Sequence, residues 1–171
     1  MKGYMVMMAF ILLFTISSAA ITIFSESASM THKLVSLCAV IVATYLLLQR
    51  NTYLPFLGSM ALPPTVVRDD VAPMDANVDV TLPIDGNDGE KVVYWASNPS
   101  DEIIANPWKA YGDYQNAGVA TIANGEVKMR FACPSRYNVP YGHTLRRHVH
   151  FRKQQGRSGM FGPVETVYVT C

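Results

Sequence analysis

The sequence has no charged residue between Tyr4 and Phe24. As a helix at about 1.5 Å per residue, this run extends roughly 32 Å, which matches the thickness of a hydrocarbon core. A second apolar run, Leu34–Leu48, reaches only about 22 Å. Lys33 and Arg50 flank it and can extend their side chains to the headgroups while the bilayer thins around a short helix. The pattern predicts two transmembrane helices within residues 1–50, over 4–24 and 34–48.

Two such helices would form a hairpin with its turn at 25–33, so the N-terminus and everything after Arg50 would share one side of the membrane. Lys2 and Arg50 lie on that side against Lys33 in the turn, which weakly predicts a cytosolic location for the remainder. A cleaved signal peptide is the alternative, because Lys2 precedes an apolar stretch and 17–19 are small residues. The stretch is longer than a typical signal core.

Cysteine is scarce, with three residues in 171. Cys38 lies in the second apolar run, which leaves Cys133 and Cys171 as the possible pair in the soluble part. This implies no disulfide framework and favours reducing surroundings. Asn-x-Ser/Thr acceptors are also missing, because Pro99 follows Asn98, so no motif indicates a glycosylated ectodomain.

Several motifs of nucleotide and hydrolase chemistry are absent: a phosphate loop, a nucleotide-binding glycine motif, cysteine pairs at zinc spacing and a nucleophile elbow. The glycine-rich segment 156–162 lacks the lysine of a phosphate-binding loop and reads as a connection between strands. These chemistries are therefore not expected.

The remaining chain reads as mainly β. Residues 51–90 are rich in proline and predict a tether with one short strand at 78–82, where apolar and polar residues alternate. From 91 to 171, short β-type runs alternate with turn signals, and Ala123-Asn124-Gly125 predicts a hairpin. The segment 106–108 is expected in a loop. We expect an antiparallel β-sandwich of about seven strands, with strands near 92–96, 118–122, 126–131, 148–152 and 165–170.

Charge is divided along this part. Eleven acids lie between Asp69 and Glu126, whereas Lys128 to Arg157 contains eight bases and no acid. Either the bases pair with acids on neighbouring strands, or they form a basic face for headgroups, an acidic protein or nucleic acid. The residues assigned to that basic patch are Arg136, Arg146, Arg147, Arg152 and Lys153.

One arrangement has a spacing with chemical meaning. His148 and His150 are two residues apart on a predicted strand, so both project from the same face and can share a metal ion. Tyr137 precedes them by eleven residues. A phenolate oxygen joined to two imidazoles favours a hard, oxidised iron. The alternative is a pair of structural or surface histidines and a buried tyrosine.

Short motifs in residues 91–169 resemble, in their order, the intradiol ring-cleavage dioxygenases, β-sandwich enzymes that hold iron(III) with two tyrosines and two histidines. The resembling segments are Trp95-Ala96-Ser97-Asn98, Gly118-Val119-Ala120-Thr121 with Asn124-Gly125, Pro134-Ser135-Arg136-Tyr137, His148-Val149-His150-Phe151 and the closing strand at 164–168. The resemblance implies Tyr137, His148 and His150 as iron ligands. The second tyrosine is Tyr94, Tyr111 or Tyr114, of which Tyr111 best fits the order.

The sequence also departs from that family. Ala123 stands where the hairpin motif has aspartate, and no Arg-Pro precedes the histidines, since Arg146 and Arg147 are out of register. Substrate-pocket elements are scarce in so short a domain. Because folds outlast the sites built on them, a domain without iron is the favoured reading of the sequence.

Two functions follow from the sequence. The favoured one is a non-catalytic structural protein without a cofactor, which binds the lipid bilayer through its helices and other structural proteins through its β domain; nucleic acid is a less favoured partner. This architecture resembles the minor capsid and inner-membrane proteins of large DNA viruses, which implies a virion membrane location. The alternative is an iron(III) dioxygenase, or a degenerate relative, that acts on an aromatic substrate beside the membrane.

Overall fold

A computed structural model describes residues 2–54, 57–62, 66–139, 142–156 and 159–171. The chain divides into two compact units, Met1–Gly58 and Ser59–Cys171. Each unit has its own internal packing.

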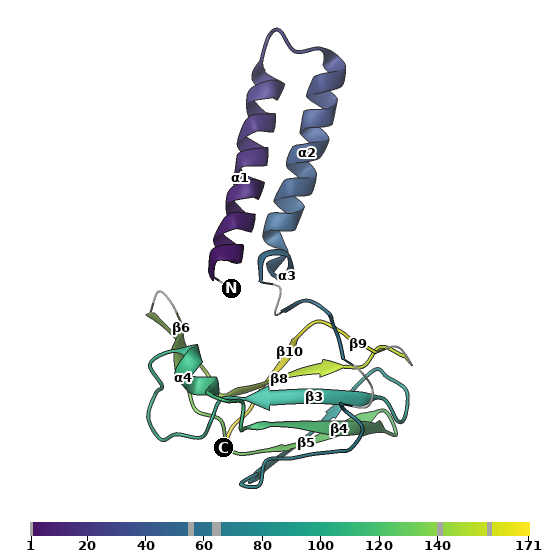
Figure 1. Cartoon of the computed structure of the whole chain (residues 1–171), viewed down its shortest axis with the longest axis vertical. Coiled ribbons are helices and arrows are strands. Elements are labelled where there is room, and N and C mark those ends of the chain that lie inside the picture. The colour runs from purple at the N-terminus through teal and green to yellow at the C-terminus, as the bar shows by residue number, and fades with distance from the viewer. Residues whose placement is uncertain (1, 55–56, 63–65, 140–141, 157–158) are drawn as a thin grey trace. The chain divides into compact units, whose positions relative to one another are not determined.

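The first unit is helical. Helix α1 (Lys2–Phe24) and helix α2 (Met30–Leu48) pack against each other as an antiparallel pair, and the short helix α3 (Arg50–Tyr53) follows (Figure 1). Within the pair, Val6–Phe24 and Met30–Leu48 are long and apolar enough to cross a membrane. Ser29 caps the start of α2 by accepting a hydrogen bond from the backbone N–H of His32.

The composition of this unit suits an apolar solvent. Hydroxyl groups of Thr15 and Thr22 donate to the carbonyls four residues earlier in α1, so neither hydroxyl lacks a hydrogen-bond partner within the helix. Among the side chains of the pair whose burial is described, Leu12, Ala19 and Ala43 are the most buried. Small residues at such a contact let two helix backbones approach closely, whereas most of the large apolar side chains face outward.

The second unit is built on one six-stranded sheet in which every pair is antiparallel. Its strand order is β10-β8-β3-β4-β5-β2, with bounds Glu165–Tyr168, His148–Lys153, Lys91–Ala96, Ala117–Ala123, Glu126–Phe131 and Val78–Pro83. The prediction of a mainly β, antiparallel fold is confirmed at this level. Residues of the predicted tether contribute β2 and, from Ser59 onward, belong to this unit.

The predicted sandwich is not observed in the described part of the chain. Beside the large sheet, the described residues form two small two-stranded sheets, β1 (Met60–Ala61) with β9 (Met160–Phe161), and β6 (Tyr137–Val139) with β7 (His143–Leu145). Alternation of apolar and polar residues identifies a strand with one buried face, but it does not specify whether a sheet, a helix or a loop covers that face.

Alternation within β8 separates the core from the other face of the sheet. Val149 and Phe151 belong to the hydrophobic core with Val92 and Tyr94 of β3. His148 and His150 have the opposite parity and project from the other face. The rest of the core comes from Ala96, Ala120, Ile122, Val127, Met129 and Phe131.

The hairpin between β4 and β5 has the expected turn. Asn124 and Gly125 both have positive φ, 54° and 72°, as a type I′ turn requires. Ile122 then pairs with Val127 and Ala123 with Glu126. The Asn-Gly signal in the sequence is thus borne out by the backbone.

The segment expected as a loop at 106–108 begins a short helix, α4 (Pro107–Tyr111). The Asn106 side chain accepts from the backbone N–H of Lys109 at 3.0 Å, and Pro107 occupies the first turn. Asparagine at the N-cap and proline at the first helical position are start signals. The sequence prediction was wrong because it treated both residues as turn formers.

Cys133 and Cys171 form a disulfide, while Cys38 in α2 is a free, exposed cysteine. The bond joins the segment after β5 to the segment after the edge strand β10. It opposes the expectation of reducing surroundings, which rested on the small cysteine count and on the lack of a glycosylation acceptor.

Candidate metal centre

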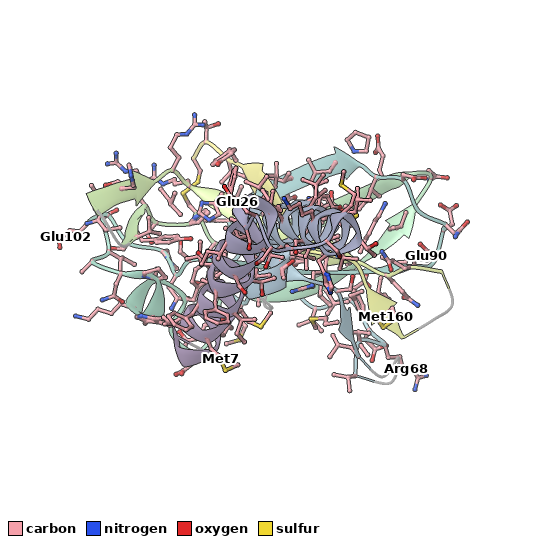
Figure 2. The ribbon with its side chains drawn as sticks, turned by 90° about the horizontal axis from the view of Figure 1, so that it is seen from above. Met7, Glu26, Arg68, Glu90, Glu102 and Met160 are labelled. Carbon is pink, nitrogen blue, oxygen red and sulfur yellow. A yellow bond between two sulfur atoms is a disulfide. The ribbon has the colours of Figure 1, made fainter. Side chains whose placement is uncertain are left out.

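The four side chains proposed as ligands come from three separate elements. His148 and His150 project from β8, Tyr137 begins β6, and Tyr111 is the last residue of α4. Contacts between α4 and β6, together with a backbone bridge between Ile104 and Tyr137, hold these elements at one end of the sheet. Figure 2 shows Glu102, two residues before that bridge, and Glu90, just before β3, at opposite ends of the β unit.

These elements bring Tyr111, Tyr137, His148 and His150 together. The Tyr111 and Tyr137 hydroxyls are 2.8 Å apart, and the Tyr137 hydroxyl lies 3.0 Å from His148 Nε2. The His148 and His150 ring centroids are separated by 4.7 Å, and those of Tyr111 and His150 by 6.1 Å. Tyr137 and His148 are each only 4 % exposed.

Hydrogen bonds outside the cluster orient the two imidazoles. His148 Nδ1 lies 2.6 Å from the Arg146 carbonyl oxygen, which can only accept, so Nδ1 carries the proton. Nε2 of His148 therefore presents a lone pair to the tyrosines, and Tyr137 donates to it. His150 Nδ1 bonds the Thr166 hydroxyl of β10 at 2.8 Å, which leaves its Nε2 for another partner. Anchoring one ring nitrogen while the other binds is usual for metal-ligating histidines.

Burial sets the protonation state of the cluster without a cation. Burial lowers the pKa of His148, against a smaller rise from its bond to the Arg146 carbonyl. Burial and then the neighbouring His148 lower the pKa of His150 to about 4. Both imidazoles are thus neutral at pH 7, the form that binds metals. Burial raises the pKa of Tyr137 and of Tyr111, and for Tyr111 the bond to Tyr137 adds to the rise.

The donor set fits a ferric ion. The lone pair of His148 Nε2, the His150 imidazole and two phenol oxygens meet in one partly buried cluster, and phenolate oxygens suit a hard cation. A bound cation reverses the local pKa balance, because it stabilises the phenolate form that burial alone disfavours. Within the described residues no group of three or more His, Cys, Asp or Glu could hold a metal, so the tyrosines are essential to this site.

The other two tyrosine candidates have different positions. Tyr94 lies in the core, where its hydroxyl bonds the Arg130 carbonyl at 2.9 Å and the Val71 carbonyl at 3.2 Å. Tyr114 is 58 % exposed, and its ring stacks on Tyr111 at 5.9 Å rather than joining the cluster. The geometry thus selects Tyr111 among the three.

The residues of the predicted basic patch have dissimilar surroundings. Arg136 and Arg146 are exposed, and they flank the paired residues Tyr137 and Leu145. Arg152 is only 4 % exposed and donates to the Gly162 carbonyl, so it does not belong to a surface patch.

Arg147 and Lys153 are half-buried and bond the carbonyls of Pro134 and Asp85. Of the wider basic stretch, Lys128 and Arg130 pair with Asp79 on β2, and Arg157 lies outside the described residues. The exposed basic surface is therefore much smaller than the run of bases in the sequence.

Sequence reasoning missed three groups that support the cluster: the Arg146 carbonyl, the Thr166 hydroxyl and the Tyr114 ring. A backbone carbonyl gives no sequence signal. Thr166 could have been found from pairing, because an antiparallel edge strand after β8 places it directly opposite His150.

A scan against protein-family models and a search of curated proteins both find no match to this chain. The likeness to the intradiol enzymes therefore rests on the short sequence motifs alone and stays a prediction.

Proposed function

We propose that the β unit binds one ferric ion through Tyr111, Tyr137, His148 and His150, in a membrane-anchored relative of the intradiol dioxygenases. One observation carries this proposal. Motif order named Tyr137, His148 and His150 and ranked Tyr111 first among three tyrosines. These four residues come from segments up to 39 positions apart in the chain, and all four meet in one cluster. Sequence reasoning alone favoured a scaffold without iron, and the cluster geometry now favours the alternative.

Iron(III) held by such ligands supplies a Lewis-acid centre that can bind an aromatic diol and promote its reaction with dioxygen. The protein's own part is to prepare the ligands. The Arg146 carbonyl and Thr166 fix the two imidazole rings with Nε2 available. Burial keeps both imidazoles neutral and limits the access of bulk water to Tyr137 and His148.

Metal analysis of the full-length chain in detergent tests the proposal. Purification in the presence of iron should yield one iron per chain and a visible band from tyrosinate bound to iron(III). Tyr137→Phe and His148→Ala should abolish both signals. His143→Ala, at an exposed histidine on β7, is the matched control and should retain them. A folded, colourless chain without iron would show that the cluster is only a hydrogen-bonded structural element.

We further propose that α1 and α2 span a membrane as a hairpin and that the β unit faces an oxidising compartment. Two signals disagree here, because Lys2 and Arg50 favour the cytosolic side by one charge. The disulfide outweighs this bias, since structural disulfides persist in oxidising compartments and are rare in the cytosol. A structural role between a capsid and its inner membrane stays a prediction.

A glycosylation reporter tests the side. Glu126→Thr completes an Asn-Gly-Thr acceptor that begins at Asn124, in an exposed turn where threonine also suits the strand. Synthesis with microsomes should then give a glycan-shifted band sensitive to a glycosidase. Glu126→Val, which creates no acceptor, is the control. An unshifted Glu126→Thr chain that is inserted in the membrane would place the β unit in the cytosol.

A further inference from the structure

Tyr114 combines an unfavourable backbone with an exposed side chain. Its φ is +58°, in the left-handed region that bulky residues rarely adopt. The side chain is 58 % exposed, so hydrophobic burial gives little compensation for that conformation. Strained residues of this kind persist where the surrounding structure over-determines them, and they cluster at functional sites.

The turn that contains Tyr114 folds back onto the end of α4. The backbone N–H of Gly112, also at positive φ, donates to the Trp108 carbonyl, and the N–H of Tyr114 donates to the Tyr111 carbonyl at 2.8 Å. This return places the Tyr114 ring on the Tyr111 ring, with centroids 5.9 Å apart and planes at 24°. The stacked ring thus belongs to the residue with the left-handed backbone.

Tyr111 needs such support more than the other three residues of the cluster. Tyr137, His148 and His150 lie on strands paired along their length. Tyr111 ends a helix of five residues, which is too short to be stable on its own. Its neighbour Ala110 is fully buried and anchors the helix backbone, but that contact does not fix the Tyr111 side chain.

We infer that Tyr114 is a positioning residue, whose stacked ring holds the Tyr111 phenol toward Tyr137 and His148. This inference deepens the proposed iron site and takes its functional meaning from it. Aromatic stacking of this type corresponds to roughly a 2- to 10-fold change in the population of the ordered ring. Removing the Tyr114 ring should therefore loosen Tyr111 without unfolding the β unit.

Nitration of the metal-free full-length chain with tetranitromethane, followed by peptide mass spectrometry, tests the positioning by itself. Tyr114→Asn suits the left-handed conformation but removes the ring, so Tyr111 should be nitrated roughly 2- to 10-fold faster than in the unaltered chain. Tyr114→Phe keeps the ring and should leave the Tyr111 rate unchanged. Loss of the stack and relief of the left-handed backbone have opposite effects on stability, so a circular dichroism spectrum equal to that of the unaltered chain should show that Tyr114→Asn is folded.

Equal nitration of Tyr111 in the unaltered chain and in Tyr114→Asn would overturn the inference. Tyr114→Gly is a second variant that suits the left-handed conformation and has no ring, and an unchanged rate of Tyr111 nitration in this folded variant would overturn the inference as well.

Iron content and the visible band are measured on the same proteins. If the unaltered chain binds no iron, the proposed function fails, while the nitration result still decides whether Tyr114 positions Tyr111. If iron binds, Tyr114→Asn should weaken iron retention and shift the visible band, and Tyr114→Phe should not. An identical band and iron content in Tyr114→Asn would count against the inference and leave the iron site intact.

Discussion

The disulfide gives the prediction whose magnitude is best defined by the structure. Cys133 and Cys171 are 38 residues apart in the chain. In the chain-entropy description, opening a loop of that length restores about 13 cal/mol/K to the unfolded state, or about 4 kcal/mol at 25 °C. For a domain of this size the loss corresponds to a fall in melting temperature on the order of 15 °C.

The effect should be concentrated at one edge of the sheet. Strand β10 pairs only with β8, through four residue pairs, and Cys171 lies three residues beyond its end. Without the disulfide, β10 should fray first and remove Thr166 from His150. The bond therefore links the stability of the edge strand to the orientation of a proposed ligand.

The assay is thermal unfolding of the full-length chain in detergent, followed by near-ultraviolet circular dichroism so that the β unit dominates the signal. The double variant Cys133→Ser with Cys171→Ser should lower the melting temperature by an amount on the order of 15 °C. A reductant should lower the melting temperature of the unaltered chain to the same value. Cys38→Ser, at the free cysteine, is the control and should change nothing. A reductant-insensitive melting temperature in the unaltered chain would refute the reasoning.

Three further predictions concern pH, packing and the membrane. The pKa of His150 is about 4 in the folded state and about 6.5 in the unfolded state, so the unfolded state binds more protons between these pH values. The stability of the metal-free chain should therefore fall as pH drops from 6.5 to 4, by up to about 3 kcal/mol. His150→Gln should flatten this pH dependence in acid titrations. Gly118→Ala should destabilise the β unit by roughly 1–3 kcal/mol in urea unfolding, because a Cβ there would overlap the Tyr94 hydroxyl and the Val71 carbonyl. Gly125→Asn, in an exposed turn, should destabilise the unit less. Alkaline carbonate should leave the full-length chain in the membrane pellet, and its release would disprove membrane spanning.

The sequence predicted the strands of the main sheet well, because each has a clear alternation or a defined turn. The run 126–131 lies in a strand with those bounds, and the Asn124-Gly125 turn has the expected positive φ values. It did not predict what packs beside the sheet. Helix α4 and the β6–β7 pair are too short to have a periodic pattern, and their positions depend on tertiary contacts such as the bridge between Ile104 and Tyr137.

The candidate site divides in the same way. That His148 and His150 share a face follows from the two-residue period of a strand. The contact between Tyr111 and Tyr137 does not follow from any local period, because these residues are 26 positions apart. Tyr137 and His148 are 11 positions apart, and they too meet only through the fold. Motif order named Tyr137 and ranked Tyr111 first among three tyrosines. Of the two groups that orient the imidazole rings, the Arg146 carbonyl has no sequence signal, and Thr166 could be found only from strand pairing.

Strand β8 ties two properties of the protein to a single register. Its odd-numbered Val149 and Phe151 fill the hydrophobic core, and its even-numbered His148 and His150 supply half of the proposed ligand set. Deleting or inserting one residue in this strand would exchange the two sets: the imidazoles would face the hydrophobic core, and the apolar side chains would face the tyrosines. Insertions and deletions in β8 are consequently restrained by the need to fold, even if the proposed site itself were under no selection.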